Sequence, residues 1–146
     1  MLNTAIIGLG RWGQRLVDSV QDVGRPKGDF IHFTRAVTRT PAKAADFAER
    51  HGMPIDSDYD AALSDPEIAA IALATPHTQH ADQIEQAAAA GKHVFVEKPF
   101  TLTAESARQA VAACERAGVV LALGHNRRFF PSMIALKQMI GEGELG

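Results

Sequence analysis

A glycine-rich segment near the N-terminus could bind the phosphates of a dinucleotide. Gly8, Gly10 and Gly13 have the spacing G-x-G-x-x-G, and the segment follows the apolar run Thr4–Ile7. In this motif the first glycine permits a tight turn, the second lets a pyrophosphate approach the backbone, and the third lets the next helix pack closely on the strand. Amide groups at the N-terminus of that helix then bind the phosphates.

The alternative interpretation of this segment is a glycine-rich turn without a ligand. The strand expected before it and the helix expected after it favour the dinucleotide-binding interpretation. We expect Trp12 to pack beside the turn and assign it no chemistry. The candidate cofactor-binding residues of the turn are Gly8, Leu9, Gly10, Arg11, Trp12 and Gly13.

The residues after the second expected strand favour a phosphorylated cofactor. NAD sites place an Asp or Glu at this strand end for the ribose hydroxyls, whereas here the strand ends in Thr38 and Arg39 and no acid follows Phe33 within it. The loop 25–29 accounts for the long spacing from the glycine motif. Hydroxyl and guanidinium donors, with Lys43 nearby, suit a 2′-phosphate. We therefore predict NADP as the preferred cofactor; the alternative is that Arg39 is a solvated surface residue and NAD is also accepted.

A second polar segment, Thr-Pro-His-Thr-Gln-His at 75–80, follows the fourth expected strand. This strand end lies beside the point where a doubly wound sheet reverses direction, where ligands bind. We expect Thr75 and Pro76 to line the cofactor cleft, and His80 either to contact the ligand or to pack beneath it as a structural residue. His77 and His80 are three residues apart, but no Glu or Cys partner completes a metal site, so we expect no metal.

Glu97, Lys98 and Pro99 close the fifth expected strand. A lysine at the carboxyl end of a strand beside a cofactor can have its pKa lowered by burial and act as a general acid or base. The position of Glu97 and Lys98 is that of the nicotinamide end of the cofactor, and a cis bond before Pro99 would fix the geometry. Most lysines are simply solvated, which is the alternative.

Short β-rich runs alternate with longer alanine-rich stretches of helical period, which indicates a parallel sheet flanked by helices. We predict an α/β fold with a doubly wound, mostly parallel sheet in three α/β/α layers, the Rossmann fold. The expected strands are Thr4–Ile7, Phe30–Val37, Met53–Ile55, Ile68–Ala74, Val94–Glu97 and Val119–Leu123.

The expected helices are bounded by capping residues and glycines. Thr40 is expected to cap a helix that ends before Gly52, and Ser57 with Asp60 to form a capping box for a short helix ending near Ser64. Thr103 is expected to cap the helix that closes at Gly118. Two further helices are expected over His77–Ala90 and Pro131–Ile140, the second with Met133, Ile134, Leu136, Met139 and Ile140 on one face.

Composition limits the classes of protein that this chain could belong to. It has 146 residues with 15 basic and 17 acidic side chains, so the net charge of −2 argues against nucleic-acid binding. No apolar run is long enough to span a bilayer and no signal peptide is evident, so we expect a cytoplasmic protein. Cys114 is the single cysteine and is expected to be a small buried residue.

Several segments, taken in order, resemble one protein family. They are GLGRWG, ATPHTQHA, GKHVFVEKPFTLTAESA, LALGHNRRFFPSM and GELG. Together they resemble the N-terminal half of the Gfo/Idh/MocA oxidoreductases, and the resemblance covers essentially the whole chain. The Glu-Lys-Pro segment is its specific element, since many families share the glycine motif.

The resemblance implies a function and roles for individual residues. Members of the family bind NAD or NADP and transfer hydride between the nicotinamide and a sugar or polyol carbon. By resemblance, Lys98 would be the catalytic residue that contacts the reacting hydroxyl, and Glu97 would lie by the nicotinamide ribose. Asn126 and Arg128 would line the nicotinamide and substrate edge; alternatively Asn126 caps a turn and Arg128 forms a salt bridge.

The family also has a second α/β domain, which gives the lysine an Asp or His partner and usually builds a homo-oligomer. We expect residues 1–146 to form only the NAD(P)-binding domain, from a truncated product or an excised domain. The alternative is a stand-alone dinucleotide-binding module that senses, regulates or needs a partner chain.

Overall fold

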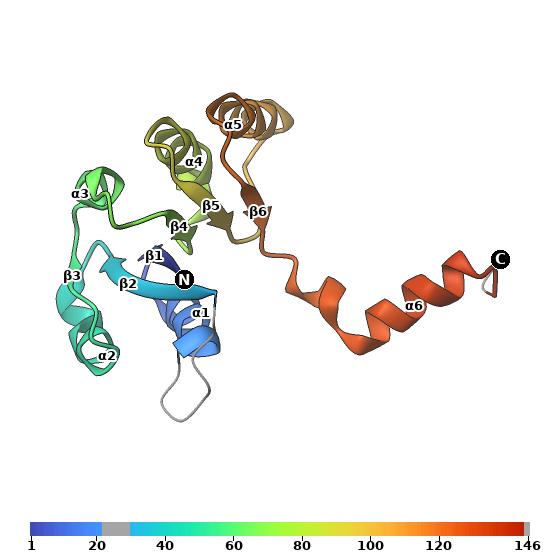
Figure 1. The fold of residues 1–146 in the computed structure, drawn as a ribbon, viewed down its shortest axis with the longest axis horizontal. Helices are drawn as coiled ribbons and strands as arrows, with labels where there is room; N and C mark the ends of the chain where they lie inside the picture. Colours follow the sequence, from blue (N-terminus) through green and yellow to red (C-terminus); the bar gives the residue numbers. More distant parts are fainter. Residues whose placement is uncertain (22–29, 145–146) are drawn as a thin grey trace.

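The computed structural model of the chain, which describes residues 1–21 and 30–144, contains one parallel sheet with the strand order β3-β2-β1-β4-β5-β6 (Figure 1). The chain therefore starts in the middle of the sheet, builds outward to β3, and then returns to the other side of β1. This is the predicted doubly wound Rossmann fold. The strands are β1 (Leu2–Ile7), β2 (Ile31–Val37), β3 (Ile55–Asp56), β4 (Ala70–Leu73), β5 (His93–Val96) and β6 (Leu121–Leu123).

Helices lie on both faces of the sheet. The α-helices are α1 (Arg11–Gln21), α2 (Ala45–Arg50), α3 (Tyr59–Ser64), α4 (His80–Ala89), α5 (Ala104–Ala117) and α6 (Pro131–Gly141). Short 3₁₀ helices are η1 (Pro41–Ala44), η2 (His77–Gln79) and η3 (Asn126–Phe129). Helices α1 and α2 cover one face, while α3, α4 and α5 cover the other, so the predicted three layers are confirmed.

The central strands are buried on both faces, which explains their continuous apolar sequences. In β1, Ala5 and Ile7 pack with α3, α4 and α5, whereas Ile6 packs with α1 and α2. Cys114 of α5 belongs to the first of these cores with 2% of its surface exposed, and burial raises the pKa of its thiol. It is the small buried residue that the sequence predicts.

Several predicted boundaries need correction. Thr40 precedes η1 but makes no side-chain capping bond. The cap of α3 is Asp58, whose carboxylate accepts from the Ala61 amide at 2.9 Å, so the Ser57 capping box is wrong. Helix His77–Ala90 begins instead as η2, and α4 starts at His80. The predicted glycine endings are confirmed, since Gly52 and Gly118 adopt positive φ angles of 66° and 67°.

The strand limits also differ, because the hydrogen-bonded ladder covers only part of most apolar runs. The run predicted over Ile68–Ala74 is a strand only in β4, and that over Val119–Leu123 only in β6. The third strand lies slightly later than predicted, at β3. The loop 25–29 was expected to account for the long spacing between the glycine motif and the end of the second strand. This loop lies outside the described residues.

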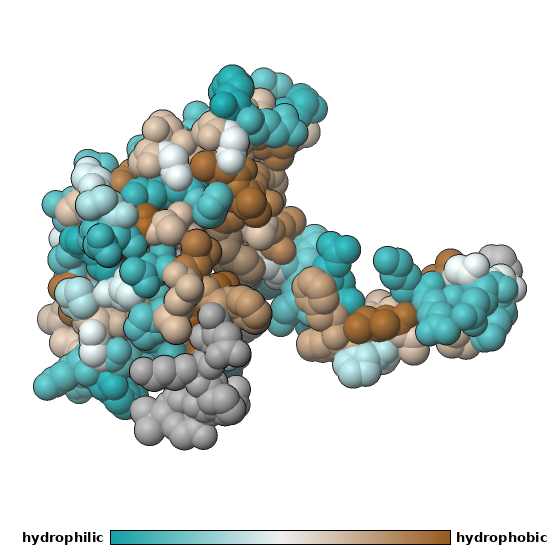
Figure 2. All heavy atoms as spheres, viewed as in Figure 1, coloured by the Kyte–Doolittle hydropathy of each residue, from teal (hydrophilic) through white to brown (hydrophobic). Residues whose placement is uncertain are grey.

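Helix α6 is formed as predicted, but it extends away from the body of the domain (Figure 1). Its apolar side chains Met133 and Ile134 are 43% and 54% exposed, and Figure 2 shows hydrophobic residues along it. On the α1 side of the sheet, an apolar hollow of about 470 Å³ lies over β4, β5 and β6. In the part of the chain that the structure describes, no helix is both long and apolar enough to cross a membrane.

Candidate functional site: a cleft at the carboxyl ends of the strands

The three glycines of the fingerprint occupy three different environments. Gly8 has φ of 94°, and a β-carbon there would lie 2.7 Å from the Ala74 carbonyl oxygen. A β-carbon on Gly13 would fall on the Gly8 carbonyl oxygen, so the helix packs against the strand through this glycine. Gly10, by contrast, faces open space. The turn is therefore closed where it meets the protein and open where a pyrophosphate would approach.

The N-terminus of α1 points its free amides into this open region. The first backbone bond of the helix runs from the Gln14 amide to the Gly10 carbonyl, at 3.0 Å. The amides before it have no partner within the helix, and the first turn contains no acidic residue. Arg11 adds an exposed positive charge there. This helix end suits an anion.

The loops after four neighbouring strands begin at the same edge of the sheet. Backbone bonds from Gly8 to Val37, from Ala74 to Ile7, from Glu97 to Leu73 and from Gly124 to Val96 extend the ladder past each strand end. Donor and acceptor lie 2.8 to 3.0 Å apart in these bonds. The glycine turn, the Thr75 segment and the Lys98 segment are therefore brought together as the sequence predicts.

A cleft of about 650 Å³ lies at this edge. It is lined by Ile7, Gly8, Gly10, Val37, Thr38, Arg39, Ser57, Tyr59, Ala74, Thr75, Pro76, Gln79 and Gln83. Gly8, Gly10, Thr38, Arg39, Thr75 and Pro76 were expected there. Thr38 is half-buried and held by a bond from its amide to the Asp56 carbonyl at 2.9 Å, while Arg39 is exposed. Leu9, at 3% exposed, instead packs in the core below the turn.

Four of the polar lining residues were not among the predicted site residues: Ser57, Tyr59, Gln79 and Gln83. Ser57 follows β3 directly, so its place at a strand end was the signal that could have found it. Tyr59 donates a hydrogen bond to the Gln83 carbonyl at 2.8 Å, and Thr75 Oγ1 donates to Gln83 Oε1 at 2.6 Å. Burial, with the Asp60 carboxylate as a smaller cause, raises the pKa of Tyr59.

His80 lies beneath the cleft and does not line it. Its side chain is 1% exposed, and its ring nitrogens face backbone carbonyl oxygens of Thr75, Pro99 and Phe100. Of the two predicted roles, the structure therefore favours the packed structural residue over direct contact with the ligand.

The Glu97, Lys98 and Pro99 segment combines a buried carboxylate with an exposed amine. Glu97 is 7% exposed, and a β-carbon on Gly124 would lie 2.9 Å from its Oε1, so a larger residue at 124 would require the Glu97 side chain to shift. The bond between Lys98 and Pro99 is cis, as predicted. Lys98 is exposed, so the burial that the sequence argument invoked is not provided by the described residues.

Trp12 connects the Lys98 segment to the glycine turn. The Lys98 Nζ lies 5.9 Å from the centroid of the indole ring, and the guanidinium of Arg15 lies 5.7 Å from it. Both distances are within the range of cation–π attraction. Trp12 is 38% exposed, so it borders the site and is less enclosed than expected.

Asn126 and Arg128 lie apart from the cleft. Both are exposed on η3, and Arg128 lines a separate hollow with Phe129 and Met133 at the start of α6. Its guanidinium lies 5.6 Å from the Phe129 ring. In residues 1–21 and 30–144, no three His, Cys, Asp or Glu side chains are grouped closely enough to hold a metal ion.

A parallel doubly wound sheet with this glycine turn at its switch point defines a dinucleotide-binding Rossmann domain. The chain belongs to the Gfo/Idh/MocA oxidoreductase family: the family model described as "Oxidoreductase family, NAD-binding Rossmann fold" matches residues 2–125. This confirms the resemblance inferred from the ordered segments, and it does not favour the stand-alone sensing module.

Similar proteins include a polyol dehydrogenase and a biliverdin reductase. The chain is 36% identical over 144 residues, 98% of its length, to the uncharacterized oxidoreductase YrbE of Bacillus subtilis. Scyllo-inositol dehydrogenase from Lactobacillus casei has a TM-score of 0.87 with 28% identity and full coverage of this chain. Biliverdin reductase from Synechocystis, solved with biliverdin and NADP⁺, has a TM-score of 0.80 with 26% identity over 96% of this chain.

The chain spans only part of the length of these proteins. It covers 41% of YrbE, and 43% of the inositol dehydrogenase and of the biliverdin reductase. The family description names NAD, whereas the biliverdin reductase was solved with NADP⁺. A nicotinamide dinucleotide is therefore the ligand class of the family.

Proposed function

We propose that this chain is the NADP-binding domain of an oxidoreductase that acts on a sugar or polyol hydroxyl. The observation that carries the proposal is the contact between two strand ends: Lys98 after β5 lies over Trp12 of the glycine turn after β1. A reactive amine thus stands beside the turn that would hold the pyrophosphate. When bound, the dinucleotide supplies a nicotinamide carbon that accepts or donates hydride.

The preference for NADP rests on Thr38 and Arg39. Both line the cleft, on the side where β2 ends, and the strand end carries no carboxylate to bind ribose hydroxyls. A 2′-phosphate there would meet the Thr38 hydroxyl and the Arg39 guanidinium, which forms strong charge-assisted hydrogen bonds with phosphate. Lys43 is exposed on η1 and adds positive charge nearby.

The proposed chemistry assigns Lys98 the proton and leaves the hydride to the cofactor. In the oxidation direction Lys98, deprotonated in the complete site, would accept the hydroxyl proton, while the hydrogen on the same carbon would leave with its electron pair for the nicotinamide. The carbon becomes a carbonyl, and the lysine becomes an ammonium group. In the reduction direction the ammonium returns the proton to the forming alkoxide.

The remaining site residues have supporting roles in this proposal. Thr75 and Pro76 form a wall of the cleft. Glu97 would lie beside the nicotinamide ribose. Asn126 and Arg128 lie on η3, apart from the cleft of this chain, and would line the substrate edge in the complete site. The partner of Lys98 would come from the rest of the protein. A polyol-like substrate is supported by the similarity to scyllo-inositol dehydrogenase.

The cofactor preference can be tested with one pair of variants. Arg39→Gln should weaken NADPH binding about tenfold or more, because a charge-assisted hydrogen bond contributes about 1.5–3 kcal/mol, and should leave NADH binding unchanged. Arg116→Gln is the matched control, since Arg116 is exposed on α5 and does not line the cleft. Equal losses for NADPH and NADH, or no loss, would refute the role of Arg39.

A further inference from the structure

A single buried histidine connects the two turns that flank the proposed nicotinamide end of the cleft. His80 Nδ1 lies 3.0 Å from the Pro99 carbonyl oxygen and 3.1 Å from that of Phe100. On the other side of the ring, Nε2 lies 3.0 Å from the Thr75 carbonyl oxygen. Thr75 lines the cleft, and Pro99 directly follows Lys98.

The partners of the ring determine how many protons it must carry. Carbonyl oxygens only accept hydrogen bonds, so each ring nitrogen of His80 has to donate. A neutral imidazole has one N–H and could serve only one of the two turns. The other nitrogen would then present a lone pair to a carbonyl oxygen, at a side chain that is only 1% exposed to solvent. The doubly protonated ring serves both sides with charge-assisted bonds.

The turn that carries Lys98 has few other attachments. The Glu97 amide donates a hydrogen bond to the Leu73 carbonyl at 3.0 Å, which fixes Glu97. The Lys98 amide, by contrast, donates only to the neighbouring Glu97 carboxylate, at 3.3 Å. Within the described parts of the chain, the backbone of residues 98–100 makes hydrogen bonds to other segments only through His80. Phe100 also packs its side chain against the core on this face of the sheet. His80 therefore supplies the hydrogen-bonded attachment of this turn to the segment after β4, and Phe100 supplies an apolar one.

We propose that His80 is a positioning residue that carries both ring protons and holds the Lys98 turn against the Thr75 turn, so that Lys98 stays over Trp12. This inference rests on the proposed function only in that Lys98 is the reacting amine; the geometry it concerns exists without cofactor. His80 acts through the two turns and has no contact with the reacting atoms.

The test uses Trp12, the single tryptophan of the sequence, as the reporter in the absence of nucleotide. Lys98→Met removes one of the two cations near the indole, leaves Arg15 in place, and defines the change in Trp12 emission that loss of the Lys98 contact produces. His80→Phe keeps a ring of similar shape but loses both N–H groups, so it should reproduce at least half of that change. His80→Asn keeps a donor near the Nδ1 position and should return the emission toward that of the unaltered chain.

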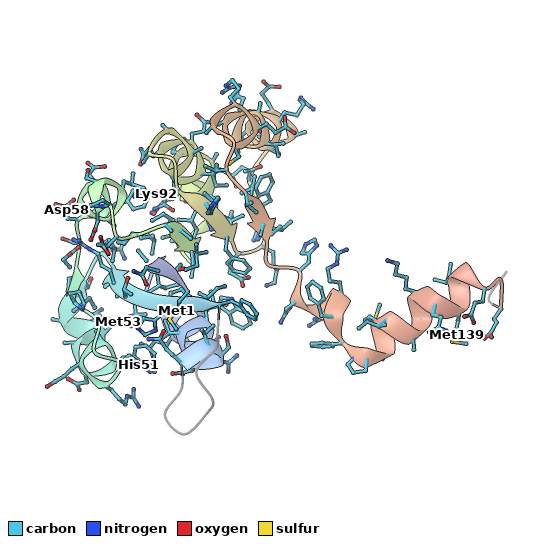
Figure 3. All side chains as sticks on the ribbon, viewed as in Figure 1. Met1, His51, Met53, Asp58, Lys92 and Met139 are labelled. Carbon is cyan, nitrogen blue, oxygen red and sulfur yellow. The ribbon has the colours of Figure 1, made fainter. Side chains whose placement is uncertain are left out.

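His51 is the matched control for these variants. It is another buried histidine, with its side chain 3% exposed, but it joins α2 to Asp18 of α1 at 3.0 Å, at a different part of the fold (Figure 3). His51→Phe should therefore leave the Trp12 emission unchanged. An unchanged emission in a folded His80→Phe chain, or an equal change in His51→Phe, would overturn the proposal.

A second measurement on the unaltered chain keeps the proposal testable if His80→Phe does not fold. A ¹⁵N-edited proton spectrum near pH 7 should show protons on both ring nitrogens of His80, assigned by their loss in His80→Asn. A single ring N–H would overturn the proposal. If the chain shows both protons and the expected emission changes but binds no NADPH, the proposed function fails while the positioning role stands.

Discussion

The ammonium group of Lys98 lies 5.9 Å from the centroid of the Trp12 ring, across the cleft edge between β5 and β1. This contact joins two segments that are 86 residues apart in the chain. It places the one reactive amine of the Glu97, Lys98 and Pro99 segment beside the helix end that would hold a pyrophosphate. The predictions below follow from this arrangement and from the packing that supports it.

The role of Lys98 predicts a separation between binding and turnover. In the whole protein, Lys98→Ala should lower kcat by ~10²–10⁴-fold, which is the usual contribution of a general acid or base. The affinity for NADPH should change little, because the phosphates bind at the glycine turn. Steady-state kinetics and a direct binding titration measure the two quantities. An unchanged kcat would remove Lys98 from the reaction.

The fingerprint glycines should differ sharply in their tolerance of a methyl group. Gly13→Ala should destabilise the fold strongly, because its β-carbon would meet the Gly8 carbonyl oxygen and α1 would have to move away from β1. An alanine within a helix otherwise stabilises it by about 1 kcal/mol relative to glycine. Gly10→Ala faces open space and should leave the melting temperature close to that of the unaltered chain. Thermal unfolding gives the melting temperatures of the two variants. Equal melting temperatures would contradict the packing role of Gly13.

The cap of α3 makes a prediction about two adjacent residues. Asp58→Ala should cost about 0.5–2 kcal/mol of unfolding free energy, because its carboxylate accepts from the Ala61 amide. Ser57→Ala should cost little, since Ser57 has no capping role. Urea unfolding at neutral pH compares them. A larger loss for Ser57→Ala would show that the sequence-based assignment was correct after all.

The raised pKa of Tyr59, the single tyrosine, predicts that the unaltered chain and Tyr59→Phe differ in how their unfolding free energy depends on pH above 10. The pKa of Tyr59 is raised in the folded chain, so the folded state holds the phenol proton more tightly than the unfolded state, in which the pKa is near 10. This contribution is complete below about pH 10 and is lost as the pH rises further. Unfolding free energy should thus fall more steeply above pH 10 in the unaltered chain than in Tyr59→Phe.

A control at neutral pH separates this ionisation from the lost hydrogen bond. Tyr59→Phe should be about 0.5–1.5 kcal/mol less stable at pH 7, because the bond to the Gln83 carbonyl is removed. If the two proteins lose stability in parallel above pH 10, ionisation of Tyr59 is not coupled to folding.

The sequence was most informative where a local pattern determines the structure. The apolar runs and the glycine spacing predicted the strands near the sheet centre and the turn after β1, because buried parallel strands and a close helix contact impose those residue types directly. Parallel strands end at a common edge of the sheet, and this rule predicted which residues line the cleft there: Thr38, Arg39, Thr75 and Pro76. The α3 cap was assigned one residue early, because Ser57 and Asp58 are both good capping residues and only the backbone distinguishes them.

Features that depend on distant contacts could not be predicted. The role of His80 is set by carbonyls 19 and 20 residues further along the chain, and a lone histidine carries no signal for them. The sequence predicted the apolar face of α6, but the direction of that helix depends on its neighbours. Lys98 was expected to be buried, yet the residues described leave it exposed.

The measurement that tests the central claim most directly is a titration of the chain with NADPH, followed through energy transfer from Trp12 to the reduced nicotinamide. Trp12 is the only tryptophan, so the signal arises at the proposed site. We predict saturable quenching of Trp12, and its loss in Gly10→Val, whose side chain would occupy the open face of the turn. A folded chain that binds no NADPH, or a folded Gly10→Val variant that binds it equally well, would contradict the account.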